Sequence, residues 1–145
     1  MSTTTFYGKL EYAWETSNSL VCVGLDPDIT KFPEAVKNSP RPILEFNRAI
    51  VDATADLVCA YKPQIAYFAA HAAEAELAAT IDYIRTKAPH AVVILDAKRG
   101  DIGSTAALYA KEAFIRYGAD AVTVNPYLGG DSLEPFLDYS EKGTV

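Results

Sequence analysis

Short apolar runs alternate with stretches of helical period along most of the chain. Four of these runs are typical of buried strands and lie at residues 20–25, 60–68, 91–95 and 121–124. The stretches with apolar side chains on one helical face lie at residues 6–17, 42–58, 72–87 and 105–117. Strict alternation of strands and helices predicts an α/β protein with a parallel sheet and helical crossovers.

Turn and capping residues mark several of the predicted boundaries. Residues 27–41 are rich in proline and are predicted to form a loop, while Pro42 suits the first turn of the helix that follows. Ser104 is expected to cap the helix over 105–117, and Gly118 is expected to end it.

The end of the chain resembles the start of another repeat. Asp131 and Glu134 have the spacing of a capping box, which predicts a fourth helix that ends at Gly143. The last strands recur about every 30 residues, so a fifth strand is expected near Val145. A closed (β/α)8 barrel takes about 200 residues or more, so this chain has room for about half of one. The alternative left open by the pattern is a small, open, doubly wound sheet.

Composition and charge narrow the class of partner. The 145 residues are 50% hydrophobic and 22% charged, which is typical of a folded domain. The net charge of −6 disfavours nucleic acid or an anionic membrane as a partner, although a small anionic substrate needs only a local basic site. The chain shows no secretory leader and no apolar stretch of bilayer length, so we expect it in the cytoplasm.

Polar residues gather where the predicted strands end. They are Asp26, Lys62, Asp96, Lys98, Asn125 and Tyr127. In parallel α/β folds, sites are built at this carboxyl edge of the sheet. Asp96 and Lys98 are two apart, so both point to the same side if the strand continues through them, and Lys62 comes from the neighbouring strand. With Asp101 in the following loop, the sequence predicts an alternating set of two lysines and two carboxylates.

Such a set of charges has a chemical use. Each ammonium and carboxylate keeps its neighbour ionised. The ammonium can stabilise negative charge on carbon and then donate a proton, while a carboxylate held against a substrate carboxylate favours loss of CO2. The spacing alone leaves plainer interpretations open: an ion pair of Asp96 and Lys98 that closes a strand, a turn at Asp26, and a solvated strand end at Lys62.

The motif residues resemble a known family. The segment Asp96-Ala-Lys98-Arg-Gly-Asp101-Ile102-Gly is similar to the Asp-x-Lys-x-x-Asp signature of orotidine 5′-phosphate decarboxylases. The segments Val-Gly-Leu-Asp26-Pro, Lys62-Pro-Gln-Ile-Ala-Tyr-Phe and Asn125-Pro-Tyr-Leu-Gly-Gly resemble the longer bacterial branch of that family, in the same order. The resemblance implies a (β/α)8 TIM-barrel fold, with residues 1–145 forming a partial barrel domain of about the first four βα units.

The resemblance also implies an activity. Members of the family convert orotidine 5′-monophosphate to uridine 5′-monophosphate in pyrimidine biosynthesis, as homodimers without a metal or organic cofactor. By resemblance, Lys98 is the proton donor, and Asp96 lies against the leaving carboxylate. Asp26 and Lys62 are expected to bind the ribose hydroxyls, and Asn125 is expected to contribute to substrate binding.

Three further residues are assigned across the dimer interface by the same resemblance. Asp101, Ile102 and Thr105 are expected to reach into the neighbouring subunit's site, where Asp101 completes the charged set and Thr105 touches the ribose region. The family's phosphate grip and closing loop come from later strands and loops, which this chain does not contain. Because remote phosphate binding supports the chemistry at the ring, we expect little or no activity from this chain alone.

Two alternative functions remain at this stage. Relatives with a similar motif act on sugar phosphates with a magnesium ion, as decarboxylases or aldol-type synthases, and the Arg-Gly pair and the Lys-Pro-Gln segment favour the orotidine branch over them. A half barrel could instead be a non-catalytic fragment or assembly module, which would tend to self-associate through exposed apolar edges.

Overall fold

Five parallel strands form the centre of the protein, whose computed structural model describes residues 4–145. The strands are β1 (Cys22–Leu25), β2 (Ala60–Pro63), β3 (Val92–Arg99), β4 (Ala121–Val124) and β5 (Gly143–Thr144). They pair in the sequential order β1-β2-β3-β4-β5, and every pair is parallel. A doubly wound sheet reverses its strand order at a switch point, so the sequential order favours the barrel. The fifth strand lies where the repeat predicted it.

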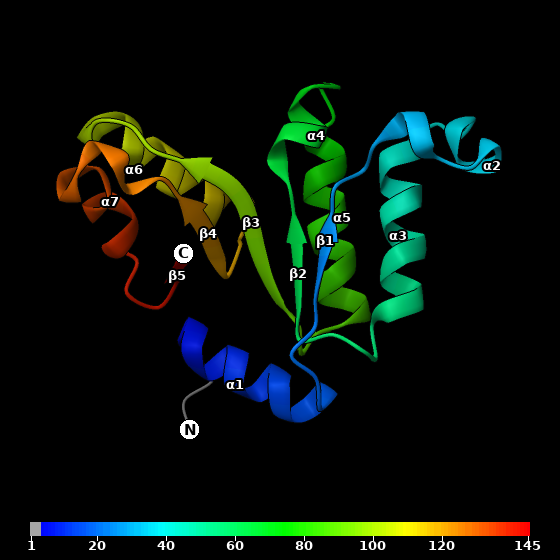
Figure 1. Cartoon of the computed structure of the whole chain (residues 1–145), viewed down its shortest axis with the longest axis horizontal. Helices are drawn as coiled ribbons and strands as arrows, with labels where there is room; N and C mark the ends of the chain where they lie inside the picture. The colour runs from blue at the N-terminus through cyan, green and yellow to red at the C-terminus, as the bar shows by residue number, and fades with distance from the viewer. Residues whose placement is uncertain (1–3) are drawn as a thin grey trace.

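Helices connect the strands, and one precedes them. They are α1 (Phe6–Ser17), α3 (Pro42–Thr54), α5 (Glu74–Lys87) and α6 (Gly103–Lys111). The strand arrows of β1 and β2 point toward one end of the molecule, α1 lies across the opposite end, and α3 and α5 lie together beside these strands (Figure 1). The carboxyl ends of the strands are therefore left to the loops that carry the predicted site residues.

The segment between β1 and the end of α4 differs from the prediction in three places. The predicted loop over 27–41 contains a 3-10 turn, η1 (Ile29–Lys31), and a one-turn helix, α2 (Glu34–Lys37). The strand expected over 60–68 ends at Pro63, and α4 (Ile65–Ala69) follows. The side-chain oxygen of Gln64 accepts a hydrogen bond from the Ala66 amide at 3.3 Å, which caps this helix and ends the extended backbone.

The helix after β3 begins and ends differently from its predicted form. Ile102, not Ser104, occupies the capping position of α6, and it makes no side-chain capping hydrogen bond. A π-helical turn, η2 (Glu112–Arg116), continues the helix. Gly118 ends it in the left-handed conformation, with φ of 63°, as predicted.

The predicted capping box is wrong. The segment after β4 forms two 3-10 turns, η3 (Pro126–Leu128) and η4 (Gly130–Ser132), before the short α7 (Glu134–Leu137), which has no side-chain cap. Gly143 does not end this helix but begins β5. A Cβ at Gly143 would lie 2.7 Å from Cδ1 of Phe6 in α1, so the glycine is needed where helix and strand pack closely.

The main core lies between the sheet and the outer helices. Its large buried side chains come from strands and helices alike: Leu25, Tyr61, Val93, Leu95 and Val122, and Ile43, Phe68, Leu77, Ile81 and Ile84. Leu57, which the helical period placed on the apolar face of a helix over 42–58, lies beyond the end of α3 and is 56% exposed. None of the helices within residues 4–145 is long and apolar enough to cross a membrane.

Candidate active site

The carboxylate of Asp96, on β3, is the centre of the candidate site. Its Oδ2 accepts hydrogen bonds from Nζ of Lys62 at 2.8 Å and from Nε2 of Gln64 at 3.1 Å. Its Oδ1 accepts from Nζ of Lys98 at 2.6 Å and from Oγ1 of Thr123 at 2.9 Å. The Asp96 side chain is only 8% exposed. Residues of β2, β3 and β4, with Gln64 just after β2, therefore converge on one buried carboxylate.

A bulge in β3 shapes this convergence. Leu95 pairs with Val122 and Arg99 pairs with Val124, so three residues of β3 face the single residue Thr123 of β4. Lys98 lies within the bulge and has a positive φ of 47°, which is rare for a residue other than glycine. This backbone turns the Lys98 side chain toward Asp96, only two residues before it.

The electrostatics of the site follow from these contacts. Burial raises the pKa of Asp96, but hydrogen bonds from Lys62, Lys98 and Thr123 outweigh it and hold that pKa at about 2. Burial lowers the pKa of Lys62, but the Asp96 carboxylate and the charge of Asp26 outweigh it, so that this pKa is raised above its ordinary value. At neutral pH the site thus holds an ionised carboxylate in contact with two ammonium groups.

Asp26 is the fourth predicted residue that the structure brings to this place. It follows the last residue of β1 and is exposed, and its charge acts on Lys62 of the neighbouring strand. Strand pairing explains the approach, because Gly24 and Leu25 lie opposite Lys62 and Pro63. The structure therefore gathers Asp26, Lys62, Asp96 and Lys98 at the carboxyl edge of the sheet, as predicted.

Comparison with known proteins shows which family has this arrangement. The sequence model of the "Orotidine 5'-phosphate decarboxylase / HUMPS family" matches residues 19–144. The chain belongs to this family. The match includes every residue that the sequence assigned to the site.

Individual members of the family are closely similar to the chain. It is 64% identical over 143 residues to the orotidine 5′-phosphate decarboxylase of Cellvibrio japonicus and 62% identical over 141 residues to that of Dechloromonas aromatica. Both matches cover 97% of this chain but 52% of the relative. The chain thus spans about half the length of the curated relatives it matches.

Solved structures of the family have the same fold over the same part. The orotidine monophosphate decarboxylase of Leishmania donovani superposes with a TM-score of 0.81 at 35% identity, over 97% of this chain and 52% of that one. The UMP synthase of the same organism superposes with a TM-score of 0.82 at 35% identity, over 99% of this chain and 30% of that one. The five strands are accordingly part of a TIM-barrel fold.

Three predicted residues of the family motif lie away from the charged cluster. The Asp101 carboxylate accepts a hydrogen bond from the Ile102 amide at 2.7 Å, and this is the one side-chain hydrogen bond of Asp101 within the described residues. Ile102 is 68% exposed and Thr105 is half-buried. The structure does not join Asp101 to Asp96 or to the lysines within one chain.

Asn125, the residue expected to contribute to substrate binding, forms the turn after β4. Its Oδ1 accepts a hydrogen bond from the Tyr127 amide at 3.0 Å, and its own amide donates to the Arg99 carbonyl at 2.6 Å. A Cβ at Gly100 would lie 2.9 Å from the Asn125 carbonyl oxygen. Asn125 is exposed and holds the loop after β3 against the end of β4, whereas its contact with substrate remains a prediction.

Two residues of the site were missed in the sequence. Gln64 was noted only as part of a family segment, and Thr123 was taken as one position of an apolar strand. The signal for Thr123 was its place as the lone hydroxyl residue in the run Ala-Val-Thr-Val. Its partners depend on the bulge in β3, which apolar periodicity does not reveal.

The described residues also bear on metal binding. Within residues 4–145, no group of three or more histidine, cysteine, aspartate or glutamate side chains lies close enough to hold a metal ion together. The hydrogen-bond donors to the Asp96 carboxylate are two ammonium groups, a side-chain amide and a hydroxyl.

Proposed function

We propose that this chain carries the charged part of an active site that decarboxylates orotidine 5′-monophosphate to uridine 5′-monophosphate, in pyrimidine biosynthesis. The observation that carries the proposal is the single buried carboxylate of Asp96 between the ammonium groups of Lys62 and Lys98. The curated relatives at 64% and 62% identity are decarboxylases of this substrate by name, which supports the same reaction here.

The geometry suits a decarboxylation in two steps. A substrate carboxylate next to Asp96 is destabilised by the like charge, and this repulsion disappears when neutral CO2 leaves. As the bond from the ring carbon to the carboxylate breaks, its electron pair stays on the ring carbon. Lys98 then donates a proton from Nζ to that carbon, a new C–H bond forms, and the neutral amine regains a proton from solvent.

Lys98 suits the role of proton donor better than Lys62 does. The Lys98 side chain is 66% exposed, whereas that of Lys62 is 31% exposed. Lys98 contacts Asp96 through one N–H and keeps other N–H groups for a bound substrate. Lys62 donates a hydrogen bond to Asp96, and the charge of Asp26 acts on it, so we assign Lys62 and Asp26 to the ribose hydroxyls, with Asn125 as a further substrate contact at the same edge.

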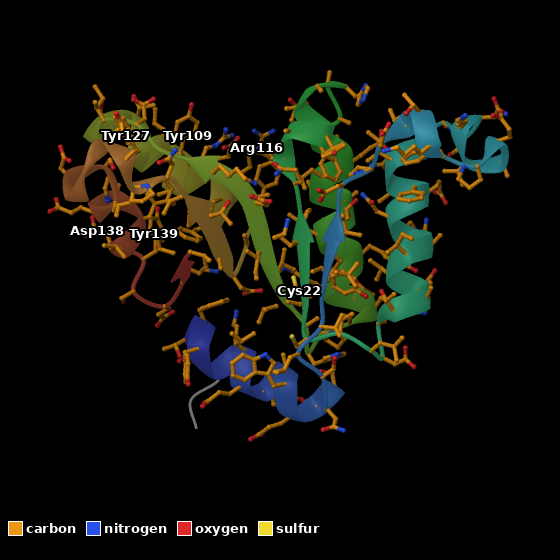
Figure 2. The ribbon with its side chains drawn as sticks, viewed as in Figure 1. Cys22, Tyr109, Arg116, Tyr127, Asp138 and Tyr139 are labelled. Atoms are coloured by element: carbon orange, nitrogen blue, oxygen red, sulfur yellow. The ribbon has the colours of Figure 1, made fainter. Side chains whose placement is uncertain are left out.

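The loop after β3 supports a second part of the proposal, a homodimer with shared active sites. Asp101, Ile102 and Thr105 would then act in the partner's site. Large apolar side chains are exposed around this loop and on the helix that follows it: Ile102, Leu108, Ile115, Tyr127 and Leu128. Figure 2 shows Tyr127 and Tyr109 at the same end of the molecule, the one formed by β3, β4 and α6. Exposed apolar side chains in such number favour a protein interface. We further expect an enzyme of pyrimidine biosynthesis to work in the cytoplasm.

Complementation tests the proposed reaction. The chain would be mixed with a separately produced second half of the Cellvibrio japonicus relative, and loss of the orotate absorbance would be followed. We expect turnover only in the mixture, because the residues that bind the substrate phosphate in the family lie outside this chain. Lys98→Ala should lower the rate by about 10²–10⁴-fold, the usual contribution of a positioned proton donor.

Two controls make the result specific. Lys37→Ala removes a lysine of α2 whose ion-pair partner is Glu34, and it should leave the rate unchanged. A chelator should not affect the decarboxylase, whereas it would stop a magnesium-dependent sugar-phosphate enzyme.

A mixture in which Lys98→Ala is as active as the unchanged chain would rule out the proposed chemistry. A mixture with no turnover at all, from well-folded halves, would favour a non-catalytic half barrel.

A further inference from the structure

The hydroxyl of Thr123 makes hydrogen bonds with three residues of β3, which is as many as a hydroxyl can make. Its Oγ1 accepts hydrogen bonds from the backbone amides of Ala97 at 3.0 Å and of Lys98 at 2.9 Å. The same hydroxyl donates to Oδ1 of Asp96 at 2.9 Å. A hydroxyl has two lone pairs and one proton. Because the two amides occupy both lone pairs, the proton can point only at the carboxylate.

These bonds replace the ladder that the bulge interrupts. In a regular parallel pair, the amides of β3 would donate to carbonyl groups of β4. Here the residues between Leu95 and Arg99 have only Thr123 opposite them. An amide without an acceptor is costly in a packed sheet, so the side-chain oxygen of Thr123 takes the place of the missing carbonyl groups.

The same bonds hold Lys98 in its unusual conformation. A positive φ is strained for a residue other than glycine, and Lys98 has φ of 47°. The hydrogen bond from its amide to Thr123 compensates for that strain, and its Nζ then meets Oδ1 of Asp96 at 2.6 Å. Both contacts of Oδ1, with Lys98 and with the hydroxyl, therefore depend on one residue of β4.

We propose that Thr123 is a positioning residue, whose hydroxyl sets the backbone of Lys98 and the orientation of the Asp96 carboxylate for proton transfer. The proposal rests on the proposed function for its catalytic part, while the geometric part stands without substrate. Within the described residues, the charged groups that contact Asp96 are Lys62 from β2 and Lys98 from β3, and the charge of Asp26 acts on Lys62. Thr123 carries no charge and acts through these groups.

The first test uses the chain without substrate and compares Thr123→Val with Thr123→Ser. Valine keeps the shape but removes the hydroxyl, so the NMR signals of the Ala97 and Lys98 amides should shift and their hydrogen exchange should become faster. The titration midpoint of the Asp96 carboxyl should rise from about 2 toward its ordinary value, because a hydrogen bond to the charged form is lost. Serine should keep the amide signals and the midpoint close to those of the unchanged chain.

The outcome of this test decides the geometric part. Unchanged Lys98 amide exchange and an unchanged Asp96 midpoint in Thr123→Val would overturn the proposal. If circular dichroism shows that Thr123→Val does not fold, Thr123→Ala takes its place with the same expectations, because it also lacks the hydroxyl and relieves any crowding. A serine variant that behaves like the valine variant would equally overturn it, since the hydroxyl would then not be the active group.

The second test uses the complemented enzyme. Thr123→Val should lower kcat by about 10–100-fold while KM changes by less than about threefold, because the substrate contacts remain and only the proton donor is displaced. Thr123→Ser should recover most of kcat. A rise in KM with kcat unchanged would overturn the catalytic part. Failure of the proposed function is distinguishable, because Lys98→Ala would then leave turnover unchanged while Thr123→Val still alters the NMR signals.

Discussion

Nζ of Lys62 lies 2.8 Å from Oδ2 of Asp96, although 34 positions separate the two residues in the chain. The parallel pairing of β2 with β3 brings them together, because it places Ala60 beside Val92 and Tyr61 beside Val93. Beyond these pairs, an isolated bridge between Gln64 and Asp96 is the next backbone contact. The ion pair and the Gln64 hydrogen bond therefore join the two strands at the edge where the site lies.

Acid should weaken the fold through Asp96. The folded-state pKa of about 2 lies below the ordinary value of 3.8, so the contribution of this carboxylate is fully present above about pH 4 and is lost as the pH falls through about 2. The shift corresponds to about 1–2 kcal/mol after allowance for solvent screening of the exposed Lys98. Urea unfolding between pH 5 and pH 2 measures it.

A variant isolates that contribution from other carboxylates. Asp28 also has a lowered pKa, held at about 2 chiefly by the hydroxyl of Thr30 and by Lys31, so the whole protein loses more than one interaction in acid. Asp96→Asn removes the titrating group at the site alone. The stability of this variant should fall less steeply between pH 4 and pH 2 than that of the unchanged chain, and equal slopes would contradict the assignment.

Substitution of Gly100 should disturb the end of β4. A Cβ there would lie 2.9 Å from the Asn125 carbonyl oxygen and 3.2 Å from the Asn125 Cβ, so the two loops would have to separate. Gly100→Ala should cost about 1–3 kcal/mol, as overpacking usually does. The Asn125 amide, which donates to Arg99, should shift in the NMR spectrum.

Gly103 offers a matched control for this effect. It begins α6, and a Cβ there would meet no atom within 4 Å. Gly103→Ala should leave the stability unchanged or raise it by about 0.4–1 kcal/mol, because it restricts the unfolded chain without a clash. Equal losses in both variants would show that crowding against Asn125 is not the cause.

Asp120 should be more important for stability than any exposed ion pair. It is 2% exposed, its Oδ2 accepts from the Val93 amide at 3.0 Å, and its Oδ1 accepts from Nζ of Lys9 at 2.7 Å. Asp120→Ala would leave the buried amide and the ammonium without this acceptor, at a cost of about 2–4 kcal/mol. Lys9→Ala should cost about 1 kcal/mol or less, because Lys9 is 38% exposed. Thermal unfolding of both variants compares the two losses.

The sequence predicted the elements of the sheet more reliably than the contacts between them. Apolar runs placed four of the strands, because a buried parallel strand is apolar on both faces, and the interval between the last strands placed the fifth. Strand ends then located Asp26, Lys62, Asp96 and Lys98 at one edge. The strand predicted over 60–68 was too long. Its second half forms a short helix capped by Gln64, and the apolar residues of a short buried helix cannot be told from those of a buried strand by periodicity.

The parts that could not be predicted depend on pairing between distant segments. Thr123 belongs to the site because β3 bulges opposite it, and a bulge is set by the register of two strands rather than by either sequence alone. The capping box at Asp131 and Glu134 also failed. The spacing was present, but Asp131 lies inside the 3-10 turn η4, and α7 begins only at Glu134 with Leu133 at its capping position.

The contact of α1 with β5 has a consequence for synthesis on the ribosome. Phe6 donates its amide to the Glu141 carbonyl at 2.8 Å, and Lys9 meets Asp120, 111 positions later. Another part of the surface that α1 packs on, around Ala60 of β2 and Val92 of β3, is translated earlier, but these two contacts form only after the segment from Asp120 to β5 has been made. The apolar face of α1 can therefore begin to dock on β2 and β3 during translation, whereas its full docking is completed only with β5.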